Sequence, residues 1–253
     1  MGVLFHDPLT LAVIVVAVIL VGLAKGGFAG FGALATPLLA TVLPPTQAAA
    51  LLLPILVVQD GIAVWSFRRD WDRWILAWML PGALIGVGLG WFYAANVNER
   101  ALMTALGALT LGFGIWRLAV TRTGRAVIAS RSPGWVGTLF GVFTGVASQI
   151  AHAGGPPFQM WVAPRGLPHL RFAATQGVLF AVVNLVKLPA FVSLGAFTRP
   201  VVATAAALVP LAVASTLVGL WLIRRVDSAR FFAIVYWLMI ALGARLLWQG
   251  IAR

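Results

Sequence analysis

The chain has 253 residues, of which 61% are hydrophobic and only 9% are charged, and its mean hydropathy is +0.99. A water-soluble domain of this length needs far more charged surface, so a soluble protein is excluded and most of the chain is expected to lie in a lipid bilayer. The net charge of +12 does not indicate nucleic-acid binding, because the arginines sit in short loops between apolar runs, where they face lipid headgroups.

The first apolar stretch, residues 9–43, is too long for a single span. It is broken by the glycine-rich segment GLAKGGFAGFGALATP, which runs from Gly22 to Pro37. Glycine and proline at this density interrupt a helix, and irregular backbone at membrane depth survives only where it is buried in protein or lines a cavity. We therefore expect a broken or re-entrant helical hairpin, followed by transmembrane helices at 46–67, 74–95 and 99–119.

The Arg-rich segment 120–133 is predicted to be a cytoplasmic linker between two repeats, residues 1–119 and residues 134–253. The second repeat again starts with a long apolar stretch, 134–164, which is broken by GVASQIAHAGGPP between Gly145 and Pro157. Three further transmembrane helices are predicted at 171–195, 200–223 and 230–251.

The distribution of arginine supports the hairpin interpretation. If both broken stretches return to the side on which they start, twelve arginines fall on one side of the membrane and four on the other. The positive-inside rule then places the larger group in the cytoplasm. The two halves acquire opposite orientations, and a weak alignment of residues 46–60 with 171–185 pairs Gln59 with Asn184. The predicted fold class is an all-α integral membrane protein built from two inverted-topology repeats, each a broken hairpin plus three transmembrane helices.

The two glycine breaks resemble those of the TauE/SafE family of membrane permeases, also called the sulfite exporter or toluenesulfonate-uptake family. The resemblance extends over the whole chain, although Ala33 and Leu34 stand where more glycine is common. It implies transport of sulfur oxyanions or organosulfonates such as sulfite or sulfoacetate, with export as the expected direction. The residues that carry it are Gly26, Gly27, Gly30, Gly32 and Pro37 in the first break and Gly154, Gly155, Pro156 and Pro157 in the second.

A helix that breaks inside the membrane presents free N–H groups and the positive end of a helix dipole, which together favour an anion. The coupling candidates are Asp60, His152 and Lys187, because an ionisable group inside a membrane is functional by default. Structural alternatives remain open: Lys25 could compensate the C-terminal end of its helix, Asp60 could be a buried hydrogen-bond partner, and Lys187 could snorkel. The predicted substrate-binding residues are Lys25, Gly26, Gly27, Gln59, Gln149, His152, Gly154, Gly155 and Asn184.

We expect a secondary transporter that works by alternating access, with one repeat rocking against the other; an anion channel, or a permease for a different small organic anion, is the alternative. No GxxxxGK[ST] phosphate-binding loop occurs, and three histidines without ligand spacing do not predict an enzyme. No cofactor is expected. The expected partners are the bilayer, a small anionic substrate and a coupling proton or sodium ion. A bacterial-type inner membrane is the expected location, and the oligomeric state is left open.

Overall fold

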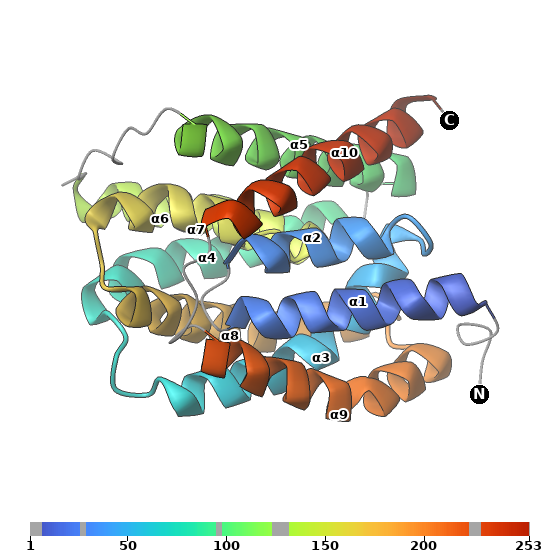
Figure 1. The fold of residues 1–253 in the computed structure, drawn as a ribbon, viewed down its shortest axis with the longest axis horizontal. Coiled ribbons are helices and arrows are strands. Elements are labelled where there is room, and N and C mark those ends of the chain that lie inside the picture. The colour runs from blue at the N-terminus through green and yellow to red at the C-terminus, as the bar shows by residue number, and fades with distance from the viewer. Residues whose placement is uncertain (1–6, 26–28, 95–97, 123–131, 223–228, 253) are drawn as a thin grey trace.

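The computed structural model describes residues 7–25, 29–94, 98–122, 132–222 and 229–252, and every regular element in these ranges is helical. Figure 1 shows the helices lying side by side, with both chain ends at one end of the bundle. A short 3-10 turn at Ala163–Arg165 follows α7. The helices are α1 Pro8–Lys25, α2 Ala29–Leu39, α3 Pro45–Ser66, α4 Arg73–Ala94, α5 Glu99–Arg122, α6 Gly134–Ala151, α7 Gly155–Val162, α8 His169–Ser193, α9 Arg199–Leu222 and α10 Ala229–Ala252.

The six predicted transmembrane helices coincide with α3, α4, α5, α8, α9 and α10 to within a few residues. In the described ranges, α1, α3, α4, α5, α6, α8 and α9 are long and apolar enough to cross a membrane. α10 is not among these seven, although it has 24 residues. The prediction of an all-helical, multi-pass membrane protein is therefore confirmed.

Both predicted breaks are present, because α1 ends at Lys25 before α2 begins at Ala29, and α6 ends at Ala151 before α7 begins at Gly155. The two arms of each broken stretch are unequal, which the sequence did not indicate. α1 and α6 have 18 residues each, or about 27 Å at 1.5 Å per residue, and are therefore spans in length. Only α2 and α7, with 11 and 8 residues, are half-helices, and α2 folds back beside α1 (Figure 1).

The helices of the two predicted repeats are interleaved. α1 packs against α9 while α6 packs against α4, and α3 contacts α9 while α8 contacts α4. Between the two halves, α5 also packs against α10, α3 against α8 and α2 against α10. Exchanging each helix of the first half for its counterpart in the second maps all of these pairs except α2–α10 onto one another, as an inverted repeat predicts. The repeat remains a prediction that this pattern supports. Its predicted linker, 120–133, falls largely outside the described residues, and α5 continues into it as far as Arg122.

Glycine allows the closest helix pairs to approach. A Cβ atom at Gly86 in α4 would lie 2.2 Å from the carbonyl oxygen of Val142 in α6, and one at Gly145 would lie 2.0 Å from the carbonyl oxygen of Ala83. Between α1 and α9, a Cβ atom at Gly22 would lie 2.1 Å from the hydroxyl of Ser215. Small residues of this kind let membrane helices approach to backbone distance.

Replacing Gly86 with alanine should lower the free energy of unfolding by about 1–3 kcal/mol, because the new methyl group forces α4 and α6 apart. Gly88 on the same helix is a matched control, since a Cβ atom there meets nothing within 4 Å. Gly88→Ala should leave stability unchanged or raise it slightly. Thermal unfolding of both variants in detergent measures the difference, and equal transitions would contradict a tight α4–α6 contact.

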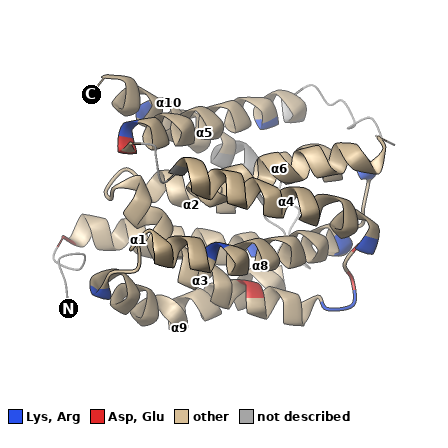
Figure 2. Ribbon diagram, turned by 180° about the vertical axis from the view of Figure 1, so that it is seen from behind, with Lys and Arg blue, Asp and Glu red and all other residues tan. Residues whose placement is uncertain are grey.

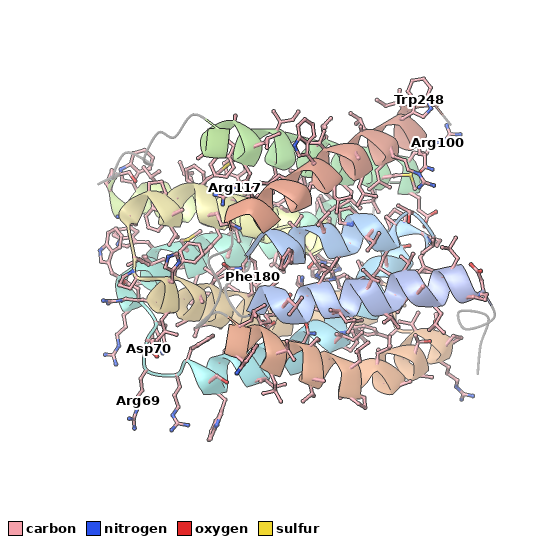
Figure 3. All side chains as sticks on the ribbon, in the orientation of Figure 1. Arg69, Asp70, Arg100, Arg117, Phe180 and Trp248 are labelled. Carbon is pink, nitrogen blue, oxygen red and sulfur yellow. The ribbon has the colours of Figure 1, made fainter. Side chains whose placement is uncertain are left out.

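Most of the charged residues lie toward the two ends of the bundle (Figure 2). Arg69 and Asp70 lie at the end where α3 passes into α4, and Arg100 and Trp248 lie at the opposite end (Figure 3). We call the first end the loop face and the second, where α1 begins and α10 ends, the terminal face. The Arg165 guanidinium at the loop face lies 4.0 Å from the ring of Trp161, an interfacial cation–π contact. The positive-inside expectation makes the loop face cytoplasmic.

Candidate functional site

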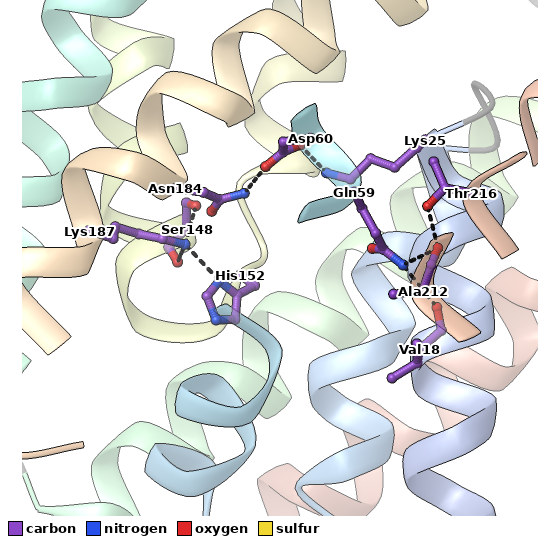
Figure 4. A network of polar contacts seen from close by, with 10 residues as sticks. All are labelled: Val18, Lys25, Gln59, Asp60, Ser148, His152, Asn184, Lys187, Ala212 and Thr216. Carbon is purple, nitrogen blue, oxygen red and sulfur yellow. Dashed lines mark hydrogen bonds and ion pairs between the residues drawn. The ribbon is translucent and has the colours of Figure 1, made fainter. Parts of the chain in front are cut away.

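Two groups of buried polar contacts lie close together in the middle of the bundle (Figure 4). Lys25, the last residue of α1, donates to Oδ1 of Asp60 in α3 at 2.5 Å, and Asn184 in α8 donates to Oδ2 of the same carboxylate at 2.6 Å. Asp60 is only 2% exposed. A buried carboxylate requires such partners, and this one joins three helices that are distant in sequence.

The second part of the network surrounds Lys187, which is fully buried in α8. Its ammonium group donates to the carbonyl oxygen of Ser148 at 2.9 Å, to the hydroxyl of Ser148 at 3.1 Å, and to Nδ1 of His152 at 2.6 Å. The other ring nitrogen of His152 lies 2.9 Å from the carbonyl oxygen of Ala49. Because a carbonyl only accepts, the proton is assigned to Nε2 and Nδ1 is the acceptor. Three acceptors thus match the three N–H groups of a charged lysine.

His152 stands on unusual backbone. It follows the last residue of α6 with φ at 52°, the one positive φ outside glycine in the described ranges. The left-handed region costs an L-residue roughly 1–2 kcal/mol, and such strain concentrates at functional positions. The bend turns the imidazole from the end of α6 toward α8 and α3, where its two hydrogen-bond partners lie.

The network is electrically unbalanced. Among the described side chains in the middle of the bundle, two lysines, Lys25 and Lys187, stand against one carboxylate, that of Asp60. Lys25 is satisfied by that carboxylate, whereas the hydrogen-bond acceptors of Lys187 are all neutral. An anion beside such a lysine would stabilise its charged form in the low-dielectric interior.

A cavity of about 60 Å³, here called the central cavity, lies beside this network. It has room for a few water molecules or one small anion. Two atoms on its wall, the hydroxyl of Thr36 and the amide oxygen of Gln176, are buried with no hydrogen-bond partner. The site therefore has unused hydrogen-bonding capacity. The polar residues that line it are Lys25, Thr36, Ser148, His152, Gln176 and Asn184.

Both half-helices begin beside the central cavity. α2 contributes Gly32 and Thr36 to its wall, α7 contributes Gly155, and the two helices contact each other. The N-terminus of α7 offers few donors, however, because Pro156 and Pro157 carry no N–H. Gly154 does not line the cavity; a Cβ atom there would lie 2.7 Å from the carbonyl oxygen of Thr144. Gly26 and Gly27, also predicted to bind substrate, lie outside the described residues.

Two predicted site residues lie elsewhere. Gln59 is buried against α1 and α9, where its amide approaches the carbonyl oxygens of Val18 at 3.4 Å and Ala212 at 3.5 Å. Gln149 lines a larger cavity of about 400 Å³ toward the terminal face, which we call the vestibule. The central cavity thus collects Lys25, His152, Gly155 and Asn184 from the predicted set, with Asp60 and Lys187 directly behind them.

Thr36, Ser148 and Gln176 line the central cavity without having been assigned to the site from the sequence. A lone threonine or serine in an apolar helix is more often a packing residue, so composition alone gives no signal. No group of three His, Cys, Asp or Glu side chains that could hold a metal ion occurs in the described ranges.

Comparison with known proteins gives one match. The family model described as sulfite exporter TauE/SafE matches residues 14–246, nearly the whole chain. Neither the curated proteins nor the solved structures contain a match. The matched region includes both breaks and every residue of the polar network described above.

Proposed function

The chain belongs to the sulfite exporter TauE/SafE family, and we propose that it carries sulfite or a small organosulfonate such as sulfoacetate across the membrane through the central cavity. The family supplies the general class, a multi-pass transporter of sulfur-containing anions. The choice of substrate, its path and the direction of export are our proposals. They are supported by the charge, the size and the polar lining of the central cavity.

The observation that carries the proposal is the unbalanced positive charge of the network. Two lysines against one aspartate make the middle of the bundle attractive to a monoanion or dianion and unattractive to a cation. The oxygens of a sulfite or sulfonate group would accept hydrogen bonds from Lys25, from the Thr36 hydroxyl and from the Asn184 amide. These groups come from α1, α2 and α8, so a bound anion would hold three helices together.

We propose that Asp60 and Lys25 couple binding to release. The carboxylate of Asp60 and the substrate are rival partners for the same ammonium group. When the anion is absent, Asp60 neutralises Lys25; when the anion is bound to Lys25, Asp60 loses this ionic partner. Proton uptake by a rival carboxylate is one physical route to proton coupling in a membrane interior.

The interleaved packing of the helices restricts which parts of the protein can move relative to one another. Rocking one whole repeat against the other would pull α4 from α6 and α1 from α9, which are held at backbone distance by glycine. We propose instead that the α1–α9 pair and the α4–α6 pair move as two units. The central cavity lies between them, lined by Lys25 of α1 on one side and Ser148 of α6 on the other.

Ligand-dependent stability tests the substrate class. Purified protein should unfold at a higher temperature in sulfite or sulfoacetate than in acetate at the same ionic strength, because a ligand bound only by the folded state adds about 2.7 kcal/mol at a hundred times its Kd. Thermal unfolding against a series of sulfite, sulfoacetate, taurine, sulfate, phosphate and acetate measures it. A rise with phosphate or acetate but not with sulfur anions would overturn the substrate assignment while leaving an anion transporter.

Flux in proteoliposomes separates a transporter from a channel. A transporter should give saturable sulfite uptake that is accelerated by unlabelled sulfite on the opposite side. A channel gives a flux that follows the electrochemical gradient without such acceleration. Loss of the acceleration in otherwise active protein would favour the channel.

A further inference from the structure

One face of α8 runs beside the whole polar path. Gln176, Phe180, Asn184, Lys187 and Phe191 follow one another at intervals of four, four, three and four residues, which places them on a single side of a helix. Gln176, Phe180 and Asn184 line the central cavity, and Phe191 lines the vestibule. Lys187 lies between the residues that line the central cavity and Phe191, which lines the vestibule. The boundary between the two spaces along α8 is therefore close to Lys187.

The wall between the central cavity and the vestibule consists of identifiable contacts. His152 lines the central cavity, and both of its contacts away from Lys187 line the vestibule. Its Nε2 faces the carbonyl oxygen of Ala49 at 2.9 Å. Its ring stacks on that of Phe191, with ring centroids 6.0 Å apart and an interplanar angle of 22°. The stacked rings of His152 and Phe191 therefore lie on the wall between the two spaces.

We propose that the stacked rings of His152 and Phe191 form the gate of the transport path on the terminal face, and that Lys187 is its latch. This inference rests on the proposed function, because it takes the central cavity to be the substrate site. The latch follows from the hydrogen bond that Lys187 donates to Nδ1 of His152. The imidazole cannot swing away from Ala49 and Phe191 without also releasing this bond.

The arrangement links opening of the gate to the substrate. When the imidazole ring of His152 moves away from Lys187, the ammonium group loses one of its three acceptors and keeps both oxygens of Ser148. An anion that enters beside Ser148 supplies the missing acceptor with a full negative charge, which makes a stronger hydrogen bond than a neutral imidazole. The gate is therefore easiest to hold open when an anion is close to Lys187, and an empty site closes it again.

The vestibule contains polar groups that can bind the anion before it passes the gate. It lies at the N-terminal ends of α3 and α9, where Thr46 and Thr198 line it. Pro45 and Pro200 carry no N–H, so the first turns of these two helices offer fewer donors than usual. The amide of Gln149 also lines it; this side chain is 3% exposed and its oxygen has no hydrogen-bond partner. A glutamine amide can turn to offer its N–H₂ group to an anion.

Thiol labelling tests the gate directly, because the chain contains no cysteine. Thr36→Cys places one thiol on the wall of the central cavity. A membrane-impermeant thiosulfonate reagent is then applied to right-side-out and to inside-out vesicles. With the gate intact, labelling from the terminal face should be slow. Adding Phe191→Ala should raise that rate at least tenfold and leave labelling from the loop face unchanged.

The matched control is Val192→Ala, the next residue of α8, whose side chain is 64% exposed and faces away from the path. Phe191→Tyr keeps an aromatic ring and should restore slow labelling, and His152→Ala should act like Phe191→Ala because the gate needs both rings. Equal rates in Phe191→Ala and Val192→Ala would overturn the gate. An increase from both faces would also overturn it, since it would indicate a generally loosened bundle.

The result is independent of what is carried. If the labelling pattern is as expected but sulfite neither stabilises the protein nor protects the thiol, the gate stands and the proposed substrate fails. If sulfite protects the thiol but Phe191→Ala leaves labelling unchanged, the proposed function stands and the gate fails.

Discussion

Lys25→Met should weaken sulfite binding about ten- to a hundredfold. The substitution keeps a long apolar side chain but removes the one ammonium group that lines the central cavity, and with it the excess positive charge of the network. A hydrogen bond to a charged group is worth about 1.5–3 kcal/mol, and each 1.4 kcal/mol is a factor of ten in affinity. Isothermal titration with sulfite, or the sulfite-dependent rise in unfolding temperature, measures the loss.

The single variant has a second effect that must be separated from the first. It leaves the buried carboxylate of Asp60 without its ionic partner, and breaking a buried pair in this way typically costs 3–5 kcal/mol of stability. The double variant Lys25→Met/Asp60→Asn removes both charges and should recover most of that stability. It should not recover tight sulfite binding, because the contact from Lys25 is still missing. Wild-type affinity in a folded double variant would contradict a direct role for Lys25.

Asp60→Asn alone should have the opposite effect and tighten sulfite binding ten- to a hundredfold. The carboxylate competes with the substrate for Lys25, and two like charges about 6 Å apart repel by roughly 3 kcal/mol at an effective dielectric of 20. Asparagine keeps the shape and can still accept the hydrogen bond from Asn184. Tighter binding should be accompanied by slower turnover, because the variant has no carboxylate at this position to compete with sulfite for Lys25 and so promote its release.

Isothermal titration with sulfite at one fixed pH measures the affinity of Asp60→Asn, and counterflow in proteoliposomes measures its turnover. Gln59→Leu is a useful neighbour control, since Gln59 contacts backbone carbonyls outside the cavity; it should lower stability and leave sulfite affinity unchanged. Unchanged or weaker affinity in Asp60→Asn would rule out competition between Asp60 and sulfite for Lys25.

The helices and their breaks could be predicted from the sequence because they depend on local properties. An uninterrupted apolar run of about 20 residues becomes a transmembrane helix whatever its neighbours are. A dense cluster of glycine and proline interrupts such a run, whereas single prolines such as Pro54 and Pro81 lie inside continuous helices. The break between Ala151 and Gly155 was predictable for this reason. The lengths of its two arms were not, because the position at which a helix bends back depends on what it packs against.

The site was only partly predictable because it depends on contacts between distant segments. Lys25 and Asp60 were each singled out as intramembrane charges, but their pairing requires α1 to end beside the middle of α3. Gln59 and Asn184 align as equivalent residues of the two predicted repeats, yet one contacts backbone carbonyls and the other binds Asp60. The two predicted repeats therefore differ at residues that take part in the polar network. One signal was available: the stripe from Gln176 to Phe191 has helical spacing and is visible in the sequence.

The interleaving of the two halves also sets the order in which the protein can be assembled. At a synthesis rate of roughly 5–20 residues per second, α1 must wait on the order of 10–40 seconds in the bilayer before the last turn of α9 has been made. During this time the Gly22 face of α1 lacks the α9 partner that covers it in the folded protein. The first half of the chain therefore cannot reach its folded state until α9 has been synthesised. A truncated product that stops before α6 would present unpaired glycine faces to the quality-control proteases of the membrane.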